Sequence, residues 1–195
     1  MGLIYCFLDV EVDGPAPGTN SMLALGIAAF DEEERELDAF EINLETLEGA
    51  AGAENVLEWW RTQPEAWAHI RRDTVPPAVG MARCLHWLES LGSDLVLAAH
   101  PLLLDGLWLD WYFRKFCNVA VFAGPFDVRC PFVGAGLDVP SYVQAALNSA
   151  YFTARPDYPP ELQGGAAHTH RPLDDARGHA ALYFAARRRV RAAHR

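Results

Sequence analysis

The sequence lacks several features that would assign the protein to a class at once. Its four cysteines are widely spaced and form no C-x-x-C pair, which argues against a zinc ribbon and a disulfide framework. No apolar run is long enough to span a membrane. The N-terminus is apolar through Leu8 but meets acidic residues at Asp9 and Glu11 without a basic n-region, so we expect no signal peptide. These absences favour a cytoplasmic protein.

Positive charge is also scarce. The chain has 26 acidic and 16 basic residues, for a formal net charge of −10, whereas proteins that track long polyanions normally carry a basic face. This balance favours short or 3′-terminal substrates if the protein acts on nucleic acid, and cations bound among carboxylates would add positive charge that the count omits. One basic cluster lies near the C-terminus, where it could contact nucleic acid or simply interact with a helix dipole and solvent: Arg187, Arg188, Arg189, Arg191 and Arg195.

The length and the apolar content suit one domain. A chain of 195 residues with 51% hydrophobic residues can bury a core, and we see no internal repeat or boundary, so 1–195 is predicted to be a single domain. A three-stranded meander followed by alternating helices and strands predicts an α/β fold with a mixed β-sheet flanked by α-helices. Period-2 and helical patterns predict strands over 3–10, 22–30, 36–44, 95–99 and 119–122, and helices over 56–69 with a break near Pro64, 77–91, 105–116, 139–147 and 174–193. The segment 151–169 is predicted to be a loop that covers the region of His170.

Acidic residues stand at the end of two apolar segments. Asp9 and Glu11 are two residues apart, so on a strand their side chains leave the same face with backbones about 7 Å apart. Asp13 continues the alternation but is predicted to favour the turn. Asp105 follows a second apolar segment and begins a predicted helix, where a carboxylate alone would cap free N–H groups. Beside Asp9 and Glu11 it becomes a candidate metal ligand.

Histidine and acidic residues meet again where the last predicted helix begins. His170 lies five residues before Asp175, and Pro172 between them suits the change from loop to helix. Neighbouring helix positions point about 100° apart, so only one of Asp174 and Asp175 can aim at a shared metal while the other caps the helix. The pattern does not choose between them. A histidine near neutrality suits general-base work, for which His170 competes with three others: His168, His100 and His179.

Four carboxylates and one imidazole form a chemical set that can hold two divalent metals and deprotonate water. Two-metal phosphodiester hydrolysis requires such a set. Oxygen-dominated ligands suit Mg²⁺ or Mn²⁺ better than zinc, although a zinc site built from the histidines is conceivable. Trp59 and Trp60 are candidates for stacking a terminal base, whereas aromatic residues at helical spacing usually fill cores, and two adjacent positions cannot both face inward.

The motif order resembles that of the DEDDh class of 3′–5′ exonucleases. D-x-E, then a carboxylate after an apolar strand, then H-x4-D on a final helix span Asp9 to Asp175. The resemblance implies a ribonuclease H-like fold, metal ligands at Asp9, Glu11, Asp105 and Asp175, and His170 as general base. It therefore favours Asp175 over Asp174. Within the class, LEWWRTQPEAW followed by PFDVRC is similar to a subgroup that includes DexA and RNase AS, with a residue lost or shifted in its Trp-Trp-x-x-Gln-x-x-x-Ala-like element.

The middle motif departs from the class. It usually reads H-N-x-x-F-D, whereas this chain keeps His100, a substrate-binding candidate with Trp59 and Trp60, but has Pro101 in place of the amide and Leu104 in place of the aromatic residue. Neither change touches the ligand set. We therefore expect altered substrate affinity rather than lost catalysis.

The resemblance implies a metal-dependent exonuclease that releases nucleoside 5′-monophosphates from the 3′ ends of single-stranded RNA or DNA. The choice of sugar depends on a contact to the 2′-OH, which the sequence does not reveal. Homodimers are common in this class, and the aromatic region around Trp59 would suit an interface. Two alternatives stay open: a nucleic-acid-binding or scaffold protein that has lost catalysis, and an endonuclease or a phosphodiesterase acting on small nucleotides.

Overall fold

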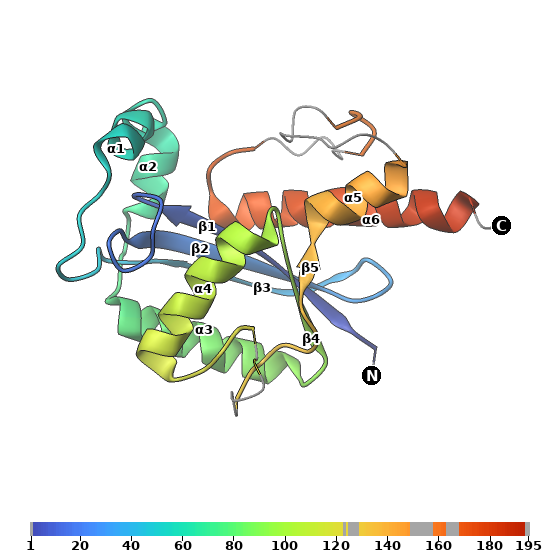
Figure 1. The fold of residues 1–195 in the computed structure, drawn as a ribbon, viewed down its shortest axis with the longest axis horizontal. Coiled ribbons are helices and arrows are strands. Elements are labelled where there is room, and N and C mark those ends of the chain that lie inside the picture. Colours follow the sequence, from blue (N-terminus) through green and yellow to red (C-terminus); the bar gives the residue numbers. More distant parts are fainter. Residues whose placement is uncertain (1, 123, 125–128, 149–157, 163–167, 194–195) are drawn as a thin grey trace.

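A mixed five-stranded sheet forms the centre of the protein (Figure 1). The computed structural model describes residues 2–122, 124, 129–148, 158–162 and 168–193. The strand order is β3-β2-β1-β4-β5, with β1 antiparallel to β2, β2 antiparallel to β3, β1 parallel to β4 and β4 parallel to β5. The meander and the mixed sheet are as predicted. The strands are β1 Ile4–Val12, β2 Met22–Phe30, β3 Glu36–Asn43, β4 Leu95–Ala99 and β5 Leu137–Asp138.

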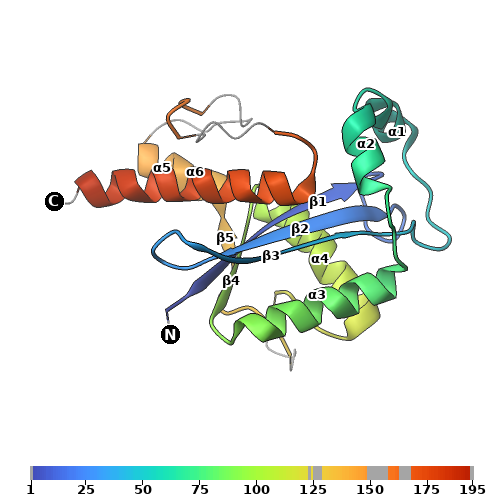
Figure 2. The same cartoon turned by 180° about the vertical axis from the view of Figure 1, so that it is seen from behind.

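Helices cover both faces of this sheet. The long helix α6 and the shorter α5 lie on one face, and α3 and α4 lie on the other, while α1 and α2 stand beyond the end at which β1 finishes (Figures 1 and 2). Pro64 begins α2, which explains the predicted break in the aromatic segment. The helices are α1 Glu54–Arg61, α2 Pro64–Ile70, α3 Pro77–Leu91, α4 Leu102–Cys117, α5 Val139–Leu147 and α6 Pro172–Ala193.

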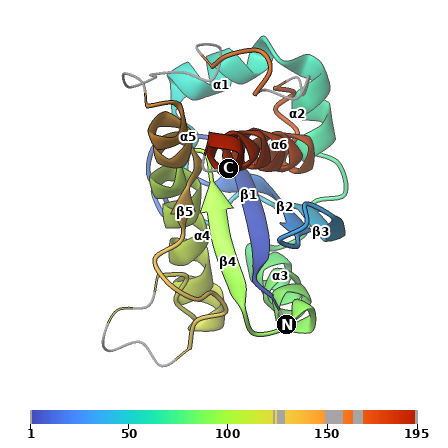
Figure 3. The ribbon, with the colours of Figure 1, turned by 90° about the vertical axis from the view of Figure 1, so that its right-hand side faces the viewer.

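Helices lie on both sides of the sheet (Figure 3), and an apolar core packs on each of its faces. One core packs α3 and α4 against the sheet and includes Leu8, Ile27, Leu97 and Trp108. The other packs α5 and α6 against the opposite face. From the loop predicted over 151–169, Tyr158 and Leu162 join this second core, whereas 151–157 and 163–167 lie outside the described residues.

Three boundary predictions were wrong. Residues 119–122 are not a strand, because the N–H groups of Val121 and Phe122 donate to the side chain of Asp110 rather than to a neighbouring strand. Helix α4 begins at Leu102 instead of Asp105, and the Leu102 N–H donates to Asp138 Oδ1, so Asp138 rather than Asp105 accepts the N–H at the start of this helix. Helix α6 begins two residues earlier than predicted, at Pro172, whose fixed φ suits a first helical position.

Two of the predicted absences can be compared with the structure. All four cysteines, which lie in described segments, are free thiols. Among the described residues, no helix combines the length and the apolar character needed to cross a membrane.

Candidate metal centre

Three acidic side chains meet where β1 ends and α6 begins. Asp9 and Glu11 are buried on β1, and Asp175 is fully buried in the first turn of α6. Each contributes a carboxylate oxygen, and these oxygens lie within 4.8 Å of one another. Asp174, the competing position, is exposed. The structure therefore brings together acids that are more than 160 residues apart in the chain, and it places Asp175 rather than Asp174 among them.

A glycine of β2 allows α6 to begin so close to the sheet. Gly26 pairs with Asp9 across the antiparallel ladder, so both positions face the same side. A Cβ atom at Gly26 would lie 2.6 Å from Leu173 Cα and still closer to the backbone of Pro172. No side chain fits there. The sequence analysis missed this residue, although a glycine inside an apolar strand is a recognised sign of close backbone approach.

Asp105 is the fourth acid of the predicted ligand set, and it is buried as well. It lies in the first turn of α4, and its Oδ2 is buried without a hydrogen-bond partner among the described residues. Burial raises the pKa of Asp105 to about 8, although N–H groups of Val10 and His100 favour the charged form. Burial, together with the negative charges of Asp175 and Asp105, raises the pKa of Glu11 to about 8. Without a cation, these carboxyls resist ionisation at neutral pH.

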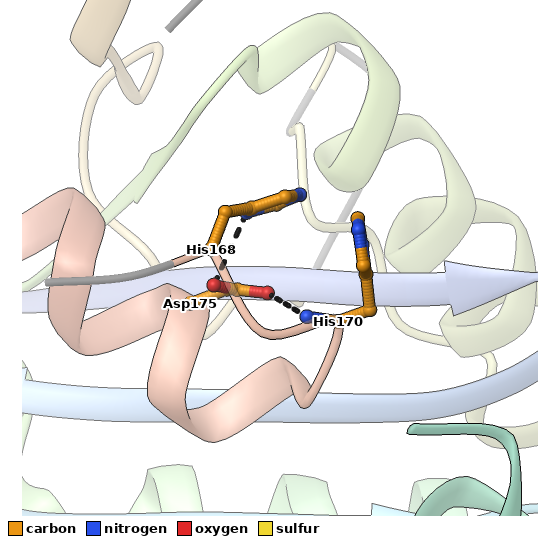
Figure 4. Close-up of side chains that lie close together, drawn as sticks. All are labelled: His168, His170 and Asp175. Atoms are coloured by element: carbon orange, nitrogen blue, oxygen red, sulfur yellow. Dashed lines mark hydrogen bonds and ion pairs between the residues drawn. The ribbon is translucent and has the colours of Figure 1, made fainter. Parts of the chain in front are cut away.

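Asp175 is stabilised as an anion by local contacts. Its carboxylate accepts the N–H of Thr169 at 3.0 Å and the N–H of His170 at 2.8 Å, and it lies 3.1 Å from Nδ1 of His168 (Figure 4). Burial alone would raise its pKa. The contact with His168 and the two N–H groups outweigh burial and hold the pKa of Asp175 below its ordinary value.

Both candidate histidines of the last motif lie at this site. The rings of His168 and His170 are edge to face, with centroids 4.2 Å apart. His170 has a left-handed backbone with φ of 56°, and its ring packs edge-on against Trp59 at 4.8 Å. Burial and the neighbouring His168 lower the pKa of His170, partly offset by Asp175. At neutral pH this imidazole is therefore mainly in the form that accepts a proton.

The two adjacent tryptophans have different environments. Trp60 is 2% exposed, and its Nε1–H donates to the carbonyl of Val12, which ties α1 to the end of β1. Trp59 is 39% exposed and contacts the ring of His170. Of these two tryptophans, only Trp59 can therefore offer a ring surface to a ligand. A cavity of about 480 Å³ lies near this region, and its lining includes Gln63, Thr169 and Arg171.

His179 lies beside Asp9, and His100 lies beside His179. His179 is buried, with Nε2 3.8 Å from Asp9 Oδ1 and Nδ1 3.3 Å from the carbonyl oxygen of Leu8. The ring of His100 stacks on that of His179, and His100 Nε2 lies 3.1 Å from the hydroxyl of Tyr158. The structure thus places His100 in a row that leads through His179 to Asp9. Its role in substrate binding stays a prediction.

Of the C-terminal arginines, Arg187 and Arg188 lie far from these acids, and Arg195 lies outside the described residues. Arg187 and Arg188 form ion pairs with Glu32 and Glu34 on the turn between β2 and β3. Arg187 lies twelve positions after Asp175, which corresponds to about 18 Å along the axis of α6. These two arginines serve the fold and do not border the metal centre.

Solved structures show the same fold. No family model matches this sequence, and no curated protein matches it. The S. pombe protein Pop2p aligns with a TM-score of 0.66 and 14% identity, over 92% of this chain and 81% of that one. A product-bound exonuclease I aligns with a TM-score of 0.65 and 12% identity, over 96% of this chain and 44% of the other. The cell-death related nuclease CRN-4 aligns with a TM-score of 0.62 and 13% identity, over 93% and 62%.

The fold is ribonuclease H-like. This agrees with the predicted fold class, and two of these neighbours are named as nucleases. The chain spans less than half the length of the exonuclease I that it matches. At 12 to 14% identity the likeness shows the fold alone. The resemblance to the DexA and RNase AS subgroup stays a prediction from the sequence.

Proposed function

We propose that the protein is a metal-dependent 3′–5′ exonuclease that hydrolyses single-stranded nucleic acid to nucleoside 5′-monophosphates. The observation that carries this proposal is the convergence of Asp9, Glu11 and Asp175, with Asp105 beside them, at one buried point. Burying like charges together costs stability unless a ligand of opposite charge binds there. The nuclease fold of the structural neighbours supports the same conclusion.

Two Mg²⁺ or Mn²⁺ ions fit this set of donors. The ligands are carboxylate oxygens, which both ions prefer, and Asp105 Oδ2 is a buried oxygen without a hydrogen-bond partner in the described part of the chain. When bound, such ions lower the pKa of water and stabilise the charge on the phosphate and on the departing 3′ oxygen. Asp9, Glu11, Asp105 and Asp175 would hold them. A neighbour, Pop2p, was solved in a form that binds Mg²⁺ and Mn²⁺.

His170 would act as the general base. Its lowered pKa keeps a ring nitrogen unprotonated at neutral pH, and its backbone N–H bond to Asp175 fixes it beside the ligands. Trp59, which packs against His170 and is partly exposed, would stack the terminal base. An unpaired 3′ end suits this arrangement, because a base within a duplex cannot reach a buried site. Among the neighbours, E. coli exonuclease I was solved with a dT13 oligonucleotide.

A net charge of −10 disfavours binding of long polyanions, so a phosphodiesterase acting on small nucleotides is the alternative function. A scaffold protein without catalysis is disfavoured because its ligand set would be expected to be broken, whereas all four acids and His170 are present and close together. A homodimer and a cytoplasmic location stay predictions from the sequence.

A degradation assay tests the proposal directly. Matched RNA and DNA oligonucleotides with a 5′ label are incubated with Mg²⁺, Mn²⁺ or a chelator, beside substrates whose 3′ end is blocked and beside the Asp9→Asn variant. We expect a ladder that shortens from the 3′ end, release of 5′-monophosphates, and no reaction with chelator, blocked ends or the variant. Internal fragments from a circular substrate, or cleavage of cyclic dinucleotides alone, would support the alternatives.

The same assay distinguishes the roles of His168 and His170. Loss of a general base typically slows catalysis by about 10² to 10⁴-fold, so His170→Ala should reduce kcat by that factor with a smaller effect on KM. His168→Ala should have the smaller effect on kcat. A larger loss of kcat in His168→Ala than in His170→Ala would indicate that His168 is the general base.

A further inference from the structure

Asp175 belongs to two clusters of ligand atoms with different chemistry. In the first, it meets the carboxylates of Asp9 and Glu11. In the second, it meets ring nitrogens of His168 and His170, and one atom from each of the three residues again lies within 4.8 Å of the others. The first cluster contains only oxygen donors, whereas the second is rich in nitrogen.

The geometry of the second cluster is close to that of a metal site. Tetrahedral sites with bonds of about 2.0–2.1 Å hold their ligand atoms about 3.3 Å apart. His168 Nδ1 and Asp175 Oδ1 are already 3.1 Å apart, so one edge of such a site exists. The rings of His168 and His170 both stand on one side of the Asp175 carboxylate (Figure 4). One ligand atom from each of the three residues lies within 4.8 Å of the other two, so a closure of at most about 1.5 Å between these side chains would complete three ligands.

The surroundings hold two of these ligands in place and leave the third accessible. Asp175 is fixed by N–H groups of Thr169 and His170, and the His170 ring is packed against Trp59. The side chain of His168 is 46% exposed, so an ion can reach the cluster from solvent. Two imidazoles and one carboxylate select ions such as Zn²⁺ or Co²⁺ over Mg²⁺, which prefers oxygen ligands and retains its waters.

We propose that His168, His170 and Asp175 form a second metal site, specific for a borderline transition metal such as Zn²⁺, that competes with the carboxylate site for Asp175. A fourth position would stay open to water. A consequence that rests on the proposed function is inhibition: Zn²⁺ bound there engages both Asp175 and His170 and withdraws them from hydrolysis.

Metal binding without nucleic acid tests the site. Zn²⁺ is titrated calorimetrically into metal-free protein, with and without Mg²⁺, and Co²⁺ is followed by its visible absorption, which is strong when the ion is tetrahedral. The variants are His168→Asn and His170→Asn, with His86→Asn, an exposed histidine on α3, as matched control. Glu11→Gln weakens the carboxylate site while keeping all three proposed ligands.

We expect one Zn²⁺ bound to wild type, to His86→Asn and to Glu11→Gln, a tetrahedral Co²⁺ spectrum, and weaker Zn²⁺ affinity in Mg²⁺. His168→Asn and His170→Asn should each lower the Zn²⁺ affinity at least tenfold more than the Mg²⁺ affinity, because a loss of even an outer partner costs about 10 to 100-fold. Equal Zn²⁺ affinity in wild type and both histidine variants would overturn the proposal. Zn²⁺ binding as expected in a protein that degrades no nucleic acid would uphold this site and overturn the exonuclease instead.

Discussion

Helix α6 contacts two groups of acidic residues, and it adds positive charge to one group and negative charge to the other. On β3 and the turn before it, Glu32, Glu34 and Glu36 each pair with an arginine of α6: Arg187, Arg188 and Arg177. At the end of β1, the same helix supplies a further acid, Asp175, to Asp9 and Glu11. The first group is neutralised by the protein itself. We propose that bound cations neutralise the second.

The energetic consequences of the two groups differ as well. Exposed ion pairs contribute about 0–1 kcal/mol each. The buried acids have little access to solvent, and burial raises the pKa of both Glu11 and Asp105 to about 8. Among the described residues, no basic side chain offsets this burial at Glu11, and Asp105 Oδ2 has no hydrogen-bond partner. Burial of these acids therefore lowers the stability of the fold, which is expected of residues that form a binding site rather than of residues that only support the structure.

The largest effect should come from removing one acid of the second group. Asp175→Asn keeps the shape but removes a charged ligand, and since metal ions supply several kcal/mol of transition-state stabilisation, kcat should fall by about 10³-fold or more. Asp174→Asn, one position away and exposed, is the matched control and should retain activity. Steady-state kinetics on a single-stranded oligonucleotide measures both. Comparable activity in the two variants would remove Asp175 from the site.

The second prediction concerns the stability of metal-free protein between pH 7 and 9. The folded pKa values of Glu11 and Asp105, about 8, exceed their ordinary values, so the folded state binds protons that the unfolded state has already lost. Stability must then decrease as pH rises through this range, by on the order of 2 kcal/mol. Urea unfolding in chelator measures this slope. Asp105→Asn should flatten it, whereas a stability that rises with pH in wild type would show that the two acids are already ionised at pH 7.

A third prediction concerns the backbone that places the site. In Gly26→Ala the added methyl group collides with the start of α6, so we expect a loss of about 1–3 kcal/mol in stability together with weaker Mn²⁺ binding. Ala28→Gly, two positions along the same face of β2, should cost about 0.5–1 kcal/mol without changing the affinity for metal. Denaturation and calorimetry on both variants separate the effects. Equal metal affinities would mean that the close approach of α6 is not required by the site.

The smallest effect is expected at the first group of acids. Arg177→Gln removes the pair with Glu36, whose side chains are partly exposed, so the free energy of unfolding should change by about 1 kcal/mol or less, and by less still in high salt. Hydrolysis should be unaffected. A large loss of activity would show that the two groups of acids are coupled through α6.

The periodic elements were predictable, and the irregular ones were not. Helix 77–91 and helix 139–147 match the structure because their apolar spacing and prolines are local signals. Strand β5, Leu137–Asp138, has two residues and therefore no period to detect. Residues 119–122 were predicted as a strand because they are apolar, but their burial arises from packing under α4, and their N–H groups bond elsewhere. The apolar character of 119–122 correctly predicted that the segment is buried, but it wrongly predicted that its backbone pairs with a neighbouring strand.

The sequence could predict which residues form the candidate site, but not which of their side chains are charged. The motif order pointed to Asp9, Glu11, Asp105 and Asp175. The fold brings ligand atoms of Asp9, Glu11 and Asp175 within 4.8 Å of one another and places Asp105 near Glu11, whereas their role as metal ligands stays a prediction. The different protonation of Glu11 and Asp175 depends on burial and on contacts with His168, Thr169 and His170 that no spacing reveals. The left-handed φ of His170 and the role of Gly26 are likewise consequences of tertiary contact.

Electron paramagnetic resonance of Mn²⁺ bound to metal-free protein tests the central claim, that the acids at the end of β1 hold a pair of cations. We predict two Mn²⁺ ions per chain with an exchange-coupled spectrum typical of ions about 4 Å apart, and loss of the coupling in Asp9→Asn. A single uncoupled ion, or a spectrum that Asp9→Asn leaves unchanged, would contradict the account.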